Sequence, residues 1–124
     1  MPRKSIVRIL IADDDFQVRG ALRLLIEQQF DDVAVEEISA AGQLLELHQC
    51  ASSDLILLDW ELPGEDRFSL LQDLKTRCPG AAVVVLSALP ESRKEALVCG
   101  ARAFISKNDP PEVFIQLLRD IAAG

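Results

Sequence analysis

The sequence predicts a single α/β domain, residues 1–124, built around a parallel sheet, and three observations support this prediction. Short apolar runs alternate with amphipathic helical patterns along the chain, an order typical of successive βα units. Four apolar runs end in polar residues, namely Asp13, Asp59, Ser87 and Lys107. The chain has 124 residues, of which 49% are hydrophobic, so it is long enough to bury a full core.

The first half of the chain is expected to hold two βα units and a third strand. Residues 6–12 form an apolar run rich in β-branched side chains, and residues 16–30 follow with apolar side chains at helical spacing. Residues 33–38 are a shorter predicted strand, and residues 40–50 a second helix. Residues 55–58 are continuously apolar, as in strands buried on both faces of a sheet.

The second half continues the alternation. Pro63 and Gly64 predict a loop after the third strand. The remaining expected elements are the helix 68–77, the strand 81–86, the helix 91–99, the strand 102–106 and the helix 111–122. The sequence therefore predicts five βα units without an internal linker or repeat.

Composition argues against several classes of function. Thirteen Lys and Arg against twenty Asp and Glu give a net charge of -7, which disfavours direct nucleic-acid contact by this segment. No apolar run reaches membrane-spanning length or forms a signal peptide, so no membrane contact is expected. Cys50, Cys78 and Cys99 lack metal-binding spacing, and we expect them to be reduced thiols in a cytoplasmic protein.

The polar strand ends predict a charged site. Because the carboxyl ends of parallel strands meet at one edge of a sheet, Asp13, Asp14 and Asp59 should lie close together. Their mutual repulsion favours a hard divalent cation with oxygen ligands, most simply Mg²⁺. Ser87 and Lys107 would add a hydroxyl and an ammonium, both suited to phosphoryl oxygens.

Three other residues have simpler expected roles. Asp15 directly precedes the first helix, where a carboxylate suits the N-cap and the helix dipole. His48 is the only histidine and lies on a predicted surface helix, so a metal-binding role is not expected of it. Trp60 is expected to cover the mouth of the site or to pack against a neighbouring loop.

Several motifs resemble one protein family. They are ILIADD at 9–14, LLDWELPG at 57–64, VVLSA at 84–88, GA at 100–101 and FISK at 104–107. Their order and spacing are similar to those of the receiver domain of two-component response regulators, over essentially the whole chain. The resemblance implies a flavodoxin-like (CheY-like) three-layer αβα sandwich with five parallel strands in the order 2-1-3-4-5.

The resemblance also implies roles for the acidic residues. Asp59 would accept a phosphoryl group from the phosphohistidine of a sensor histidine kinase or phosphotransfer protein. Asp14 would bind Mg²⁺ directly and Asp13 largely through water, with Asp59 and the backbone carbonyl of Glu61 as further ligands. Such a domain catalyses only its own phosphorylation and dephosphorylation, so it is not an enzyme in the usual sense.

The remaining implied roles concern signalling. Ser87 and Lys107 would hold phosphoryl oxygens, and Phe104 matches the switch aromatic that turns inward on phosphorylation, although packing alone would also explain it. The output surface would be the predicted fourth helix, fifth strand and fifth helix, residues 91–122. An output domain or a second receiver would dock there.

Two positions depart from the usual pattern. Arg67 stands where the family commonly has glycine, so the turn into the third helix is expected to differ. Asn108 follows the lysine where many receivers have proline. The second departure is similar to receivers joined to LuxR-type helix-turn-helix domains, which regulate transcription.

Two alternatives remain open at the level of sequence. A haloacid dehalogenase-like phosphatase also uses an aspartate nucleophile with Mg²⁺, but it needs an aspartate where this chain has Glu61. A pseudo-receiver would keep the fold and signal without phosphorylation. The complete set of polar strand-end residues argues against this second alternative.

Overall fold

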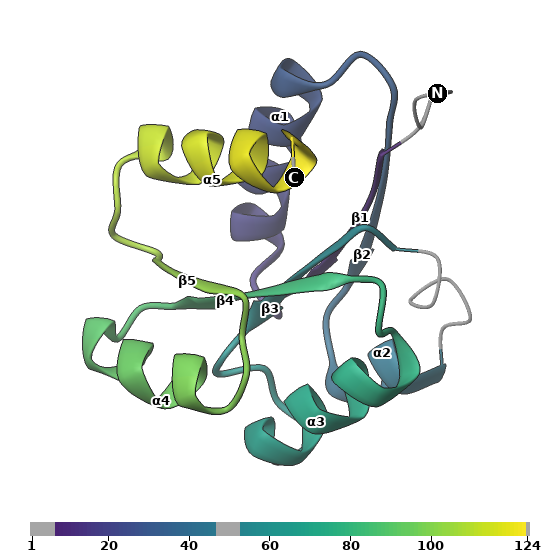
Figure 1. Ribbon diagram of the computed structural model, residues 1–124, viewed down its shortest axis with the longest axis vertical. Coiled ribbons are helices and arrows are strands. Elements are labelled where there is room, and N and C mark those ends of the chain that lie inside the picture. Colours follow the sequence, from purple (N-terminus) through teal and green to yellow (C-terminus); the bar gives the residue numbers. More distant parts are fainter. Residues whose placement is uncertain (1–6, 47–52, 124) are drawn as a thin grey trace.

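The computed structural model describes residues 7–46 and 53–123. Its strands are β1 (Val7–Ala12), β2 (Val33–Ile38), β3 (Leu55–Asp59), β4 (Ala82–Ser87) and β5 (Ala103–Ser106). They form one parallel sheet in the order β2-β1-β3-β4-β5 (Figure 1). The predicted fold class and strand order are confirmed.

Helices cover both faces of the sheet. They are α1 (Phe16–Gln29), α2 (Ala41–Glu46), α3 (Arg67–Arg77), α4 (Arg93–Val98) and α5 (Pro111–Ala123), with a 3-10 turn, η2 (Pro90–Ser92), before α4. Figure 1 shows α1 and α5 on one face and α2, α3 and α4 on the other, which makes three layers. Within the described ranges, no helix combines the length and apolar character needed to cross a membrane.

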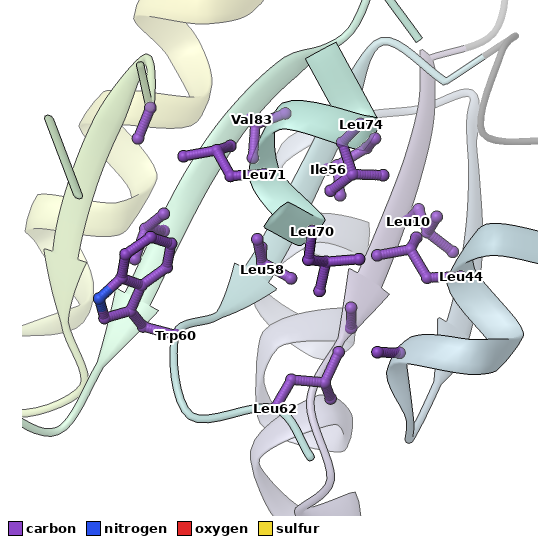
Figure 2. Close-up of a cluster of buried hydrophobic side chains, with 14 of the residues drawn as sticks. Leu10, Leu44, Ile56, Leu58, Trp60, Leu62, Leu70, Leu71, Leu74 and Val83 are labelled. Atoms are coloured by element: carbon purple, nitrogen blue, oxygen red, sulfur yellow. The ribbon is translucent and has the colours of Figure 1, made fainter. Parts of the chain in front are cut away.

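Each face of the sheet has its own hydrophobic core. Alternate side chains of a strand point to opposite faces, so Ile9 and Ile11 pack with α1 and α5, whereas Leu10 packs with α2 and α3. Figure 2 shows the second core, in which Leu58 and Leu70 lie at the centre and Trp60 lies at one side. These cores fix the sheet and leave the carboxyl edge to polar residues.

The strand register brings the polar residues to one edge. Ala12 pairs with Leu58, and Ser87 pairs with Ser106. Asp13, Asp59, Ser87 and Lys107 therefore all lie at or directly after the carboxyl ends of neighbouring strands.

Some element boundaries differ from the sequence predictions. The third helix begins at Arg67 because Asp66 caps it, its side chain accepting a hydrogen bond of 3.0 Å from the Ser69 N–H. The expected helix 91–99 opens as a 3-10 turn, in which the Ser92 N–H donates to the Leu89 carbonyl at 3.0 Å, and it is α-helical only over Arg93–Val98. The end of the expected helix 40–50 lies outside the described residues, as does His48.

The cysteines differ from the expectation of three reduced thiols. Cys78 is buried and disulfide-bonded, and Cys50 lies outside the described residues. Cys99 is a free thiol of intermediate exposure. The expectation is therefore wrong for Cys78, because distance along the chain did not indicate distance in the fold.

Candidate functional site

Three carboxylates meet at the carboxyl edge of the sheet. Asp13, Asp14 and Asp59 each offer an oxygen, and these oxygens lie within 4.8 Å of one another. Asp13 and Asp59 are buried, with 0% and 2% of their surface exposed, whereas Asp14 is exposed. The Asp15 N–H donates to Asp13 Oδ1 at 2.9 Å and orients that carboxylate. The predicted acidic cluster is thus assembled.

Asp15 itself takes the predicted role outside this cluster. Its side chain accepts hydrogen bonds from the backbone N–H groups of Gln17, at 2.9 Å, and Val18, at 3.4 Å. This is N-cap geometry for α1.

Lys107 brings a positive charge to the cluster from the end of β5. Its Nζ lies 2.8 Å from Asp13 Oδ2 and 3.4 Å from Asp59 Oδ1. Burial by itself would lower the pKa of the Lys107 ammonium, but the carboxylates of Asp13 and Asp59 outweigh burial and raise that pKa. Lys107 is therefore charged at neutral pH and faces both buried carboxylates.

The Asp59 carboxyl group has a raised pKa. Its pKa is raised from 3.8 to about 6, first because burial removes water from the carboxylate and second because the charge of Asp13 is close. A hydrogen bond from the Glu61 N–H and the charge of Lys107 oppose this rise. The ionised form of Asp59 therefore lacks part of the stabilisation that it needs.

The residues present fit a hard divalent cation. Asp13 Oδ2 is buried and has no hydrogen-bond partner of suitable geometry among the described residues, even though Lys107 is close. Two buried carboxylates and an exposed third one around a single ammonium leave excess negative charge. Carboxylate oxygens are the ligands that Mg²⁺ prefers, so a cation would both coordinate this oxygen and offset the excess charge.

The side chains of Ser87 and Glu61 are hydrogen-bonded to each other beside the acidic cluster. Ser87 is fully buried, and its Oγ donates to the Glu61 carboxylate, with distances of 2.9 Å to Oε2 and 3.1 Å to Oε1. The Glu61 N–H in turn donates to Asp59 Oδ1 at 3.0 Å. The sequence does not predict this contact between the Glu61 side chain and Ser87.

Trp60 packs on the opposite face of β3. It is 1% exposed, and its Nε1 donates to Glu95 Oε1 on α4 at 2.7 Å. Arg67 pairs with the same Glu95 oxygen at 2.8 Å, and its guanidinium carbon lies 5.3 Å from the centre of the Trp60 ring. Trp60 therefore packs against side chains of α3 and α4, not over the mouth of the site or against a neighbouring loop as the sequence predicted. We call Trp60, Arg67 and Glu95 the aromatic clamp.

Phe104 lies on β5 with 7% of its surface exposed and belongs to the core beneath α4. It is thus already turned inward. It also contributes to a groove between α4 and α5, together with Leu97, Val113 and Leu117. Leu97 and Val113 are exposed there, and the neighbouring Val98 is 78% exposed.

Comparison with known proteins identifies the family. A model of the response regulator receiver domain matches residues 9–119. The chain therefore belongs to the response regulator receiver domain family, and this assignment replaces the alternative of a haloacid dehalogenase-like phosphatase.

Individual relatives agree with the family. The nitrate/nitrite response regulator NarL of Escherichia coli K12 is 32% identical over all of this chain and 58% of its own length. A LuxR family DNA-binding response regulator from Silicibacter pomeroyi has a TM-score of 0.79 and 32% identity, covering 95% of this chain and 93% of that one. A LuxR family regulator from Aurantimonas sp. SI85-9A1 has a TM-score of 0.83 and 25% identity, covering 97% and 87%. The chain spans little more than half of NarL.

Proposed function

We propose that this chain is a phosphoacceptor receiver in which Asp59 takes a phosphoryl group from a phosphohistidine. The donor would be a sensor histidine kinase or a phosphotransfer protein. One observation carries the proposal: a buried carboxylate of raised pKa lies within reach of two other carboxylates and of the Lys107 ammonium. That combination suits the transfer of a highly charged group.

The transfer is a substitution at phosphorus. A carboxylate oxygen of Asp59 attacks the phosphorus atom, a new P–O bond forms, and the P–N bond to the histidine breaks. The electron pair of that bond stays with the imidazole. Lys107 is positioned to neutralise charge on the phosphoryl oxygens, since its Nζ already lies 3.4 Å from Asp59 Oδ1.

The metal site follows from the acidic cluster. Asp13, Asp14, Asp59 and the backbone carbonyl of Glu61 would hold Mg²⁺, and the exposure of Asp14 leaves that side open to solvent. When bound, the cation supplies positive charge to the carboxylates and to the phosphoryl oxygens. Burial of Asp13 holds its carboxylate in one place for this purpose.

The same groups allow the acyl phosphate to be removed. Ser87 would hold a phosphoryl oxygen through its hydroxyl, and Lys107 would hold another. A water molecule attacking the phosphorus would form a new P–O bond and break the P–O bond to Asp59, which releases inorganic phosphate and restores the carboxylate. The domain would act on its own aspartate and on no separate phosphomonoester.

The proposed output surface is the face formed by α4, β5 and α5. Its groove exposes Leu97 and Val113 beside Phe104, which suits docking of an output domain or a second receiver. The similarity to LuxR family regulators supports an output domain that regulates transcription. In this proposal Ser87 is the switch residue, whereas Phe104, the second expected switch residue, is already buried in this structure and would not have to turn inward. The protein would work in the cytoplasm.

Phosphoryl uptake from a small donor tests the proposal. Incubation with acetyl phosphate and Mg²⁺ should add one phosphoryl group to the intact protein, as measured by mass spectrometry. Chelation of Mg²⁺ or the variant Asp59→Asn should prevent it. Phosphoryl uptake that persists both under chelation and in Asp59→Asn would refute the proposed site. Absence of uptake by the parent would favour a pseudo-receiver.

A further inference from the structure

The Glu61 side chain occupies hydrogen-bond donors that the proposed function assigns to another group. Its carboxylate accepts from Ser87 Oγ at 2.9 and 3.1 Å and lies 3.4 Å from the Ala88 N–H. The Glu61 carboxylate is thus a negatively charged acceptor on the hydroxyl that would hold a phosphoryl oxygen.

The Ser87 hydroxyl cannot donate a full hydrogen bond to two acceptors at once. A serine hydroxyl has one proton to donate, and Ser87 Oγ itself accepts a hydrogen bond from the Leu89 N–H at 3.0 Å. Ser87 is fully buried, so its hydroxyl has little freedom to find a separate partner. A phosphoryl group on Asp59 and the Glu61 carboxylate would therefore compete for the same proton.

The geometry makes displacement of Glu61 feasible. Glu61 is exposed, so its carboxylate can exchange Ser87 for water without being buried unpaired. Its backbone is fixed near Asp59 by the hydrogen bond from the Glu61 N–H to Asp59 Oδ1 at 3.0 Å. A phosphoryl group adds roughly two negative charges close to Glu61, and their repulsion would help to expel the side chain.

We propose that Glu61 is an internal competitor for the phosphoryl group. In the unphosphorylated protein its carboxylate holds the donors of Ser87 and Ala88, and phosphorylation of Asp59 replaces one acceptor by the other. This inference rests on the proposed function. It predicts that the β4–α4 loop is already tied to the site, so that switching consists of an exchange of acceptors at Ser87.

Affinity for a phosphoryl mimic tests this proposal. The parent and Glu61→Ala are titrated with beryllofluoride in the presence of Mg²⁺, and binding is measured by calorimetry. Glu61→Ala should bind beryllofluoride roughly three- to tenfold more tightly, because a charge-assisted hydrogen bond no longer has to break and the exposure of Glu61 limits its strength. Glu65→Ala, a charge removal on the same exposed loop, is the matched control and should leave the affinity within twofold of the parent, about what a screened surface charge contributes.

A double-mutant cycle separates competition from simple charge repulsion. In a Ser87→Ala background, changing Glu61 to Ala should alter the affinity much less, because the contested hydroxyl is gone. Glu61→Gln, which keeps an acceptor oxygen, should bind with an affinity between those of the parent and Glu61→Ala. An undiminished gain in the Ser87→Ala background, or no gain in the parent background, would overturn the competitor role.

The same titration distinguishes this inference from the proposed function. Equal affinities of the parent and Glu61→Ala for beryllofluoride would reject only the competitor role of Glu61. Absence of binding in both the parent and Glu61→Ala would reject the phosphoacceptor function and the competitor with it. Binding only in Glu61→Ala would support the competitor in its strongest form.

Discussion

Asp59 and Trp60 are neighbours in sequence but point to opposite faces of the sheet, and their surroundings differ sharply. Asp59 is a buried carboxyl group beside two other carboxylates, with an incompletely satisfied charge. Trp60 is equally buried, yet its ring packs against Phe68 and Arg67 and its Nε1 has a partner in Glu95. One face is therefore arranged for a ligand, and the other is arranged for stability.

The proposed reactive site lies at the edge of a sheet that is stabilised by its hydrophobic core. The ionised Asp59 carboxylate costs folding free energy, because it is buried and lies close to the charge of Asp13. The core beside it, which includes Trp60 and Leu58 (Figure 2), compensates through apolar burial. The aromatic clamp also connects the residue after Asp59 to α4, the first helix of the proposed output face.

The largest expected effect is on the apolar side. Trp60→Ala should lower the free energy of unfolding by about 3–5 kcal/mol, because it leaves a large cavity and removes one of the two partners described for Glu95. Chemical denaturation monitored by circular dichroism measures this. Trp60→Phe keeps most of the volume and should lose markedly less, and equal losses in the two variants would show that volume is not what matters.

The next prediction is an increase in the free energy of unfolding. Without Mg²⁺ above pH about 6, Asp59→Asn should raise the free energy of unfolding by about 1–3 kcal/mol, because burial and Asp13 raise the pKa of Asp59 from 3.8 to about 6. From pH about 4 to 6 the folded state keeps a proton that the unfolded state has lost, so the contribution of Asp59 to stability falls as pH rises. Denaturation at a series of pH values in chelator should show the two proteins converging towards pH 4. A difference independent of pH would contradict the raised pKa.

Asp14 should behave differently from Asp59 because it is exposed. Asp14→Asn should change the stability of the chelated protein by less than about 0.5 kcal/mol, as is usual for exposed positions. It should nevertheless reduce the stabilisation that Mg²⁺ gives, since a ligand is lost. Thermal unfolding with and without Mg²⁺ measures both effects, and an unchanged response to Mg²⁺ would remove Asp14 from the metal site.

A further small effect concerns the ion pair of the aromatic clamp. Arg67 and Glu95 are about one-third exposed, with side-chain exposures of 35% and 36%, so solvent screens their attraction. Arg67→Ala should lower the free energy of unfolding by about 1 kcal/mol or less. A double-mutant cycle with Glu95→Ala should show a positive coupling, and strictly additive losses would mean that the pair contributes nothing.

Much of the fold could be predicted from the sequence because its signals are local. The alternation of apolar runs with helical patterns predicted the parallel sheet, and the polar residues at the run ends predicted Asp13, Asp14 and Asp59 as one cluster. Lys107 was found in the same way. Each of these inferences needs only the rule that parallel strands end at the same edge.

The contacts that sequence reasoning missed join distant segments. Glu61 and Ser87 are 26 positions apart, and Trp60 and Glu95 are 35 positions apart. Neither pair has a periodic signature, because both depend on how β3 lies beside β4 and on where α4 packs. The shortening of α4 was missed for a related reason, since η2 forms at its start in place of a full helical turn.

Identification of the modified residue tests the central claim most directly. After treatment with acetyl phosphate and Mg²⁺, borohydride reduces an aspartyl phosphate to homoserine, and peptide mass spectrometry locates the converted residue. The account predicts homoserine at position 59 and unmodified aspartates at positions 13 and 14. Conversion at either of those positions, or at a residue outside the acidic cluster, would contradict it.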